Sequence, residues 1–165
     1  ENLLKTLLHS KTLVYLDNTE ELGDIPNCHY QHLAGLASGW KTVELAARLE
    51  FNLESIVVYD RNPTQLDHAQ WLHSHAELPE QSRSYARTCG TYKPGVSKEV
   101  WKQWHQFPVQ FKQIDLFDVP QFPDQSLIWI SNVFCYESNI FDFGWKQCKN
   151  THKQLLANNT GSIII

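Results

Sequence analysis

Apolar and polar positions fall in blocks along the chain, and their period switches repeatedly between that of a strand and that of a helix. Compact apolar runs predict strands at 30–34, 55–59, 108–117, 126–130 and 162–165. Helical spacing of apolar residues predicts helices between them at 40–50, 63–78 and 140–158. This alternation is typical of a parallel sheet with right-handed crossovers. We therefore expect an α/β protein, a three-layer αβα Rossmann-like sandwich with a mostly parallel sheet.

The first 27 residues precede this alternation. Leucines at helical spacing predict a short helix at 2–10, and residues 12–16 fit either a strand or a continuation of that helix. Residues 17–27 are acidic and polar and have the composition of a loop. The segment 1–27 is either a cap that folds over a site in the core or a plain surface connection.

Residues 79–107 form the least regular part of the chain and interleave basic with aromatic side chains. Such a pattern can bind nucleic acid through phosphate contacts and base stacking. It is also typical of a solvated connection whose apolar stripe packs on the body, and we favour this interpretation for Val100, Trp101 and Trp104. We expect one domain at 1–165 with its core at 28–165 and this segment as an insertion.

Composition narrows the classes of function. A net charge of −4 at pH 7 argues against sequence-independent binding to nucleic acid, which depends on a basic surface. A nucleic-acid substrate reached through a local basic patch stays an alternative. No segment is long and apolar enough to span a bilayer, and the four cysteines include no C-x-x-C pair. We therefore expect a cytoplasmic protein with reduced thiols and no membrane contact.

Eight histidines raise the question of a metal site. The closest pairs are His29 with His32 and His73 with His75. A mononuclear site needs about three convergent protein ligands, which neither pair supplies as a motif. We predict no metal site.

A glycine-bearing turn and a distant carboxylate are the strongest functional signals. Residues 35–39, GLASG, follow the first core strand and precede the helix at 40–50. Small residues there let backbone N–H groups approach a ligand closely, and a helix N-terminus favours negative charge. Asp60 ends the second core strand, where open α/β sheets bind ligands. Gly39 and Asp60 are 21 residues apart, close to the roughly 20-residue spacing of a carboxylate that binds ribose hydroxyls.

The GLASG turn with its helix, and VVYDRNP at 57–63, resemble the first two motifs of class I S-adenosylmethionine-dependent methyltransferases. The resemblance implies that the turn lies under the methionine part of the cofactor and that Asp60 binds its ribose. Ala37 stands where the family usually has its middle glycine, and the G-x-G-x-x-G turn of dehydrogenases is absent. The cofactor-binding residues implied around these motifs are Ala34, Gly35, Ala37, Ser38, Gly39, Asp60, Arg61 and Asn62.

The end of the third core strand contacts the adenine in the same family. Asp115 and Leu116 occupy that place here, so the resemblance implies that they bind the adenine. Asp115 is also a suitable helix cap or turn former.

The segment after the fourth core strand, SNVF at 131–134, matches part of a short motif of amino-group methyltransferases. Ser131 and Phe134 match its ends, whereas Asn132 and the residue after it do not match its middle. An amino-group acceptor therefore stays open. We expect Ser131 at the cofactor and Asn132, Phe134 and Tyr136 near the acceptor, and no catalytic residue is assigned.

The resemblance thus implies a methyltransferase that uses S-adenosyl-L-methionine and acts on a small molecule or another, unnamed acceptor. The family's sheet usually continues in an antiparallel hairpin that this chain lacks, so the chain is a fragment or minimal form, or residues 12–16 supply an edge. Residues 60–66, DRNPTQL, also resemble the D-x-N-P-x-Q-L motif of aminocarboxypropyl transferases on this fold. A degenerate, non-catalytic binding module is the third interpretation, and the sequence does not indicate the oligomeric state.

Overall fold

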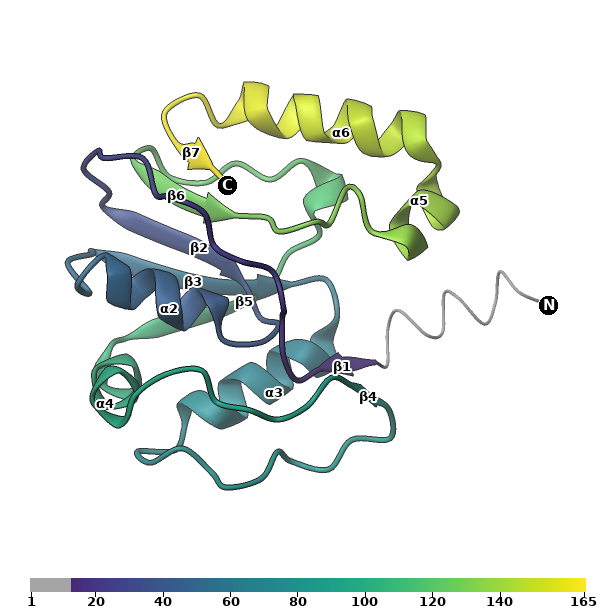
Figure 1. Ribbon diagram of the computed structural model, residues 1–165. Coiled ribbons are helices and arrows are strands. Elements are labelled where there is room, and N and C mark those ends of the chain that lie inside the picture. The colour runs from purple at the N-terminus through teal and green to yellow at the C-terminus, as the bar shows by residue number, and fades with distance from the viewer. Residues whose placement is uncertain (1–12) are drawn as a thin grey trace.

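The computed structural model describes residues 13–165, and the helix predicted at 2–10 lies outside them (Figure 1). Its main sheet has five strands in the order β5-β3-β2-β6-β7, and every neighbouring pair is parallel. The strands are β2 (His32–Leu36), β3 (Ser55–Asp60), β5 (Val109–Gln113), β6 (Ser126–Trp129) and β7 (Ile163–Ile164). Starting from β2, the chain adds β3 and β5 on one side of the sheet and then β6 and β7 on the other. The strand order reverses beside β2, where open α/β sheets form their ligand crevice.

Helices cover both faces of this sheet and confirm the predicted αβα Rossmann-like sandwich (Figure 1). One face packs against α2 (Lys41–Arg48), α3 (Pro63–His73) and α4 (Lys98–Gln106), and the other against α5 (Glu137–Phe143) and α6 (Trp145–Asn158). Successive strand residues point to opposite faces. In β6, Leu127 accordingly lies in the first core cluster and Ile128 in the second, and both are fully buried.

The helices begin and end for local reasons. Asn62 caps α3 because its side chain accepts a hydrogen bond from the Thr64 N–H at 3.0 Å, and Pro63 takes the first helical position. The predicted helix at 140–158 is two helices, because Gly144 adopts a φ of 77° between α5 and α6. Trp145 at the start of α6 is 52% exposed, whereas Cys148 of the same helix is fully buried.

The first core strand lies two residues further along than predicted. Gly35 belongs to β2 and pairs with Val58 and Trp129, so it does not open the turn. The Cβ of any other residue at Gly35 would overlap the Thr42 side chain of α2. The Thr42 hydroxyl donates a hydrogen bond to the Leu36 carbonyl at 2.8 Å. Gly35 is thus required for the packing of α2 on β2.

The N-terminal segment pairs with the insertion and not with the main sheet. β1 (Val14–Tyr15) forms a parallel two-stranded sheet with β4 (Thr88–Cys89), so the alternative that residues 12–16 supply an edge of the main sheet is wrong. Within the insertion, Trp101 and Trp104 of α4 are buried in the first core cluster, which confirms that this apolar stripe packs on the body. None of the helices found between residues 13 and 165 is long and apolar enough to cross a membrane.

Candidate functional site

A cavity of about 410 Å³ lies at the carboxyl ends of β2, β3 and β6. Its volume falls within the roughly 300–1,000 Å³ that is usual for small-molecule sites. Leu36 and Asp60, the last residues of β2 and β3, line it together with Ser131, which follows β6. We call these strand ends the floor of the cavity. The position is the one that the reversal of strand order predicts for a ligand.

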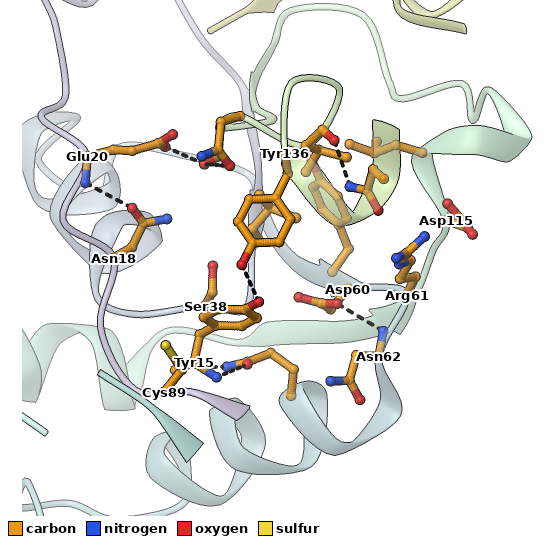
Figure 2. A pocket seen from close by; sticks show the side chains of 18 of the residues that line it. Tyr15, Asn18, Glu20, Ser38, Asp60, Arg61, Asn62, Cys89, Asp115 and Tyr136 are labelled. Carbon is orange, nitrogen blue, oxygen red and sulfur yellow. Dashed lines mark hydrogen bonds between the residues drawn. The ribbon is translucent and has the colours of Figure 1, made fainter. Parts of the chain in front are cut away.

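Asp60 is the central polar group of the floor. One oxygen of its carboxylate accepts a hydrogen bond from the Asn62 N–H at 2.9 Å (Figure 2). No described side chain donates a hydrogen bond to its second oxygen, and Figure 2 shows the carboxylate directed into the cavity. Burial raises the pKa of Asp60 to about 6, although the Asn62 N–H and the Arg61 guanidinium both favour the ionised form. Asp60 is therefore a partly desolvated carboxylate that can accept further hydrogen bonds from a ligand.

Two further residues of the DRNPTQL stretch tie the N-terminal segment to this floor. The Asn62 side chain, besides capping α3, donates to the Leu13 carbonyl at 2.9 Å. Gln65 is 1% exposed, and its amide oxygen accepts from the Tyr15 N–H at 2.7 Å. Its amide nitrogen donates to the carbonyls of Tyr15 and Ala37 at 3.1 and 3.2 Å. Asn62 and Gln65 of this motif therefore hold in place the N-terminal segment that covers the site.

Residues 13–20, which we call the strap, lie over the turn that follows β2. Gly39 has a φ of 63°, and a Cβ there would lie 2.6 Å from the Asn18 nitrogen and 2.9 Å from the Asp17 carbonyl carbon. A glycine adopts this positive φ without the strain that a side chain would cause there. The close approach that Gly39 permits is that of the strap backbone, and Gly39 does not itself line the cavity.

Polar contacts join the strap to two other parts of the chain. The Asp17 carboxylate accepts from the Thr91 N–H of the insertion at 3.0 Å. The phenol oxygens of Tyr15 and Tyr136 lie 2.6 Å apart, and the Ser131 hydroxyl donates to the Glu20 carboxylate (Figure 2). Asp17 and Glu20 both line the cavity. At residues 17–20 the N-terminal segment therefore lies over the cavity.

The adenine place predicted after β5 also lies at the cavity. Asp115 accepts from the Phe117 N–H at 2.9 Å and caps the 3-10 helix η1 (Leu116–Asp118), so the alternative role as a cap is confirmed. Asp115 and Leu116 line the cavity together with Ile114. The Arg61 guanidinium lies 5.8 Å from the centre of the Phe143 ring. This end of the cavity combines apolar walls with one carboxylate and one cation.

The structure brings together most of the predicted site residues but not all of them. Those that line the cavity are Ser38, Asp60, Arg61, Asn62, Asp115, Leu116, Ser131, Asn132 and Tyr136. Those that do not line it are Ala34, Gly35, Ala37, Gly39 and Phe134. Ala34 is buried in β2, and the Ala37 N–H donates to the Tyr59 carbonyl at 2.9 Å. Phe134 is a core residue whose ring stacks on His152, with ring centres 5.2 Å apart.

Several lining residues were not predicted from the sequence. They include Tyr15, Asn18, Gln65 and Cys89. Gln65 was present in the DRNPTQL motif, and that motif was the signal for it. Tyr15 and Cys89 reach the cavity because β1 and β4 pair across more than seventy residues, and no local pattern announces such a pairing.

The charges around the cavity are mostly negative. Among the described residues, four carboxylates line it, those of Asp17, Glu20, Asp60 and Asp115, against one guanidinium, that of Arg61. A cleft lined by one sign of charge concentrates ligands of the other sign. The arrangement favours a ligand that carries positive charge and hydrogen-bond donors.

No cluster of three or more His, Cys, Asp or Glu side chains placed to hold a metal occurs within residues 13–165. Comparison of the chain with protein-family models, with curated proteins and with solved structures finds no match. The class that the structure defines is therefore a Rossmann-like α/β protein with a covered, acidic cavity at its topological switch point.

Proposed function

We propose that this protein is a methyltransferase that binds S-adenosyl-L-methionine in the cavity at the carboxyl ends of β2, β3 and β6. The observation that carries the proposal is the Asp60 carboxylate, which ends β3 and directs its second oxygen into the cavity. A carboxylate in this place of a Rossmann-like sheet can accept hydrogen bonds from both ribose hydroxyls of a nucleoside.

The remaining lining fits the other parts of the cofactor. Ile114 and Leu116 supply apolar surface for an adenine ring, and Asp115 supplies an acceptor for its amino group. Ser38 follows β2 and lines the part of the cavity beside the turn, where the amino-acid part would lie. The excess of carboxylates suits the positively charged sulfonium. When bound, the cofactor supplies an activated methyl group.

The contribution of the protein is to position the reactants and to exclude water. Methyl transfer needs mainly proximity and alignment, since the leaving sulfur is already charged, and held reactants gain a large effective concentration. Asp60 fixes the nucleoside on the floor. The strap closes the cavity from above through Tyr15 and Glu20, which contact the loop after β6.

Isothermal titration calorimetry with S-adenosylhomocysteine tests the proposal. We expect binding by the wild-type protein and a loss of about tenfold or more for Asp60→Asn, because the charged acceptor is replaced by a neutral one. The matched control is Asp118→Asn, an exposed position outside the cavity that should bind as the wild type does. No binding by the wild type, or equal binding by Asp60→Asn, contradicts the proposal.

Aminocarboxypropyl transfer on the same site is the second candidate. It is favoured by one observation, that Asp60, Asn62 and Gln65 of the DRNPTQL motif all line the cavity. The two reactions break different bonds to the same sulfur, so their nucleoside products differ. Methyl transfer leaves S-adenosylhomocysteine, whereas aminocarboxypropyl transfer leaves methylthioadenosine. Chromatography of the products after incubation with S-adenosylmethionine and candidate acceptors decides between them.

A further inference from the structure

The two ends of the cavity differ in charge and in chemical character. In the view of Figure 2, Arg61 and Asp115 lie at one end, and Asn18 and Glu20 lie at the other. The second end is covered by the strap and contains carboxylate and phenol groups but no lysine or arginine among the residues that line it. The first end fits the adenine. The second, which we call the strap end, is left for another ligand.

Two aromatic rings border the strap end, and Figure 2 shows them between Glu20 and Asp60. Tyr15 and Tyr136 stand nearly perpendicular, at 85°, with ring centres 6.2 Å apart. Their hydroxyls hold one another at 2.6 Å, so the rings keep this arrangement. Burial and the bond to Tyr136 raise the pKa of Tyr15, so its phenol stays neutral. Neutral tyrosine rings attract cations through their negative faces and are the usual wall of an ammonium site.

A carboxylate lies at the same end. Glu20 receives the Ser131 hydroxyl as a donor and receives no contact from a lysine or arginine side chain within the described residues. The Ser131 hydroxyl in turn keeps its own lone pairs for an incoming N–H group. The other strap carboxylate, Asp17, is held by the Thr91 N–H of the insertion. Glu20 is therefore the negative group of the strap end that a ligand can neutralise.

We propose that the strap end binds a protonated amine through Glu20, Ser131 and the tyrosine pair, and that, if the proposed function holds, this amine is the methyl acceptor. Glu20 accepts one proton from the bound ammonium, which leaves a neutral amine with a free lone pair. A new N–C bond then forms as the S–C bond breaks with its electron pair remaining on sulfur. The product is a methylated ammonium beside S-adenosylhomocysteine.

Three probes of nearly equal size and different charge test the subsite: benzylamine, benzyl alcohol and benzoate. Each is titrated at pH 7 into the protein loaded with S-adenosylhomocysteine, with backbone amide shifts in ¹H–¹⁵N spectra as the readout. We expect benzylamine to bind about tenfold more tightly than benzyl alcohol and benzoate to bind weakest, with shifts at Glu20, Ser131 and Tyr136. Equal affinity for all three probes, or tighter binding of benzoate, overturns the proposal.

Two variants with the same change of charge separate a local effect from a general one. Glu20→Gln should lose about tenfold in benzylamine affinity while its affinity for benzyl alcohol stays unchanged. Glu21→Gln removes one negative charge from the next position, which is exposed and outside the cavity, and should bind as the wild type does. An equal loss in both variants, or none in Glu20→Gln, contradicts the assignment to Glu20. Melting temperatures within a degree or two of the wild type show that both variants are folded.

The proposed function and this inference fail in different ways. Binding of S-adenosylhomocysteine without selectivity for benzylamine overturns the amine subsite and leaves the cofactor proposal standing. Failure of S-adenosylhomocysteine to bind overturns the cofactor proposal, and the three probes are then titrated into the protein alone. Selectivity for benzylamine in that experiment supports the amine subsite by itself, and its absence overturns it.

Discussion

The floor of the cavity and the strap above it are stabilised by different kinds of interaction. The strands that form the floor are held by apolar burial on both faces of the sheet, with Leu33, Ile56 and Ile128 almost fully buried. Beyond Leu16 the strap is held to its surroundings mainly by polar contacts of Asp17 and Glu20 and by close packing on Gly39.

The two kinds of interaction respond differently to a perturbation. Apolar burial in a close-packed core is shared by many neighbours, so its loss destabilises the whole domain. A single hydrogen bond contributes only about 0.5–1.5 kcal/mol net, and its loss releases a local segment first. We therefore expect the strap to open at a lower free energy than the floor, which would let a ligand enter without global unfolding.

The largest effect is expected at the floor. Ile128→Ala removes three carbons from a fully buried side chain of β6 and should lower the free energy of unfolding by about 2–5 kcal/mol. Ile163→Ala on the edge strand β7 makes the same change at a half-buried site and should cost clearly less. Urea denaturation followed by circular dichroism measures both. Equal losses would show that burial in the centre of the sheet does not dominate its stability.

Substitution of Asp60 should raise the free energy of unfolding, whereas most substitutions lower it. Its pKa is raised to about 6, so the folded protein disfavours the charged form, and this cost is absent below the unfolded pKa and complete above pH 6. Asp60→Asn should therefore raise the free energy of unfolding at pH 7 by roughly 2–3 kcal/mol and have little effect near pH 3. Unchanged stability at pH 7 would show that the carboxylate is better solvated than its position indicates.

The same carboxylate makes ligand binding depend on pH. Hydrogen bonds from ribose hydroxyls favour the ionised form, so binding of S-adenosylhomocysteine should expel a proton from Asp60 below pH 6. The affinity should fall up to about tenfold for each pH unit below 6 in the wild-type protein. Calorimetry between pH 5 and 7 measures this dependence. An affinity that does not change over this range would contradict contact between Asp60 and the ligand.

A smaller and more local effect is expected where the strap is anchored. Gln65→Ala removes three hydrogen bonds that reach Tyr15 and Ala37 and should cost about 1–3 kcal/mol, since it leaves backbone groups of Tyr15 without partners. Hydrogen exchange at Tyr15 and Leu16 should speed up, while exchange in β3 follows only the global change in stability. Gln70→Ala, an exposed position of the same helix, is the control. Uniform acceleration throughout the domain would contradict a separately opening strap.

The smallest effect is expected for the tyrosine pair. Tyr136→Phe removes one hydroxyl from a single exposed hydrogen bond and should cost about 0.5–1 kcal/mol. Tyr15→Phe should cost a similar amount, and the double variant should cost no more than either single one. Thermal unfolding of the three variants completes this cycle. Additive losses would show that the two hydroxyls do not stabilise one another.

Periodicity was enough to predict the five strands of the main sheet and where each of them falls along the chain. The alternation of compact apolar runs with amphipathic helices encodes the burial of each element and is a local property. The helix cap at Asn62 and Pro63 was equally readable, because capping involves only neighbouring residues. The break at Gly144 was missed, since a single glycine with positive φ interrupts a helix without changing the spacing of its apolar residues.

In the candidate site, too, local features could be predicted and contacts between distant residues could not. Asp60 was predicted because strand ends in such sheets face the crevice, whereas Asp115 and Ser131 were implied by the resemblance, and all three line the cavity. The glycine turn was predicted to cradle a ligand, and the structure instead uses Gly35 for Thr42 and Gly39 for the strap. A sequence shows that a close approach is permitted there, but the identity of the approaching group depends on distant residues.

The sequence by itself determined the class of fold, the strand ends that line the crevice and the carboxylate at Asp60, because each follows from local periodicity and spacing. Only the tertiary structure decided that residues 13–20 cover the cavity, that Gln65 anchors them, and that Glu20 meets Ser131. These contacts join residues that are 50 to 111 positions apart. Such contacts depend on how the whole chain packs, and no short stretch of sequence contains that information.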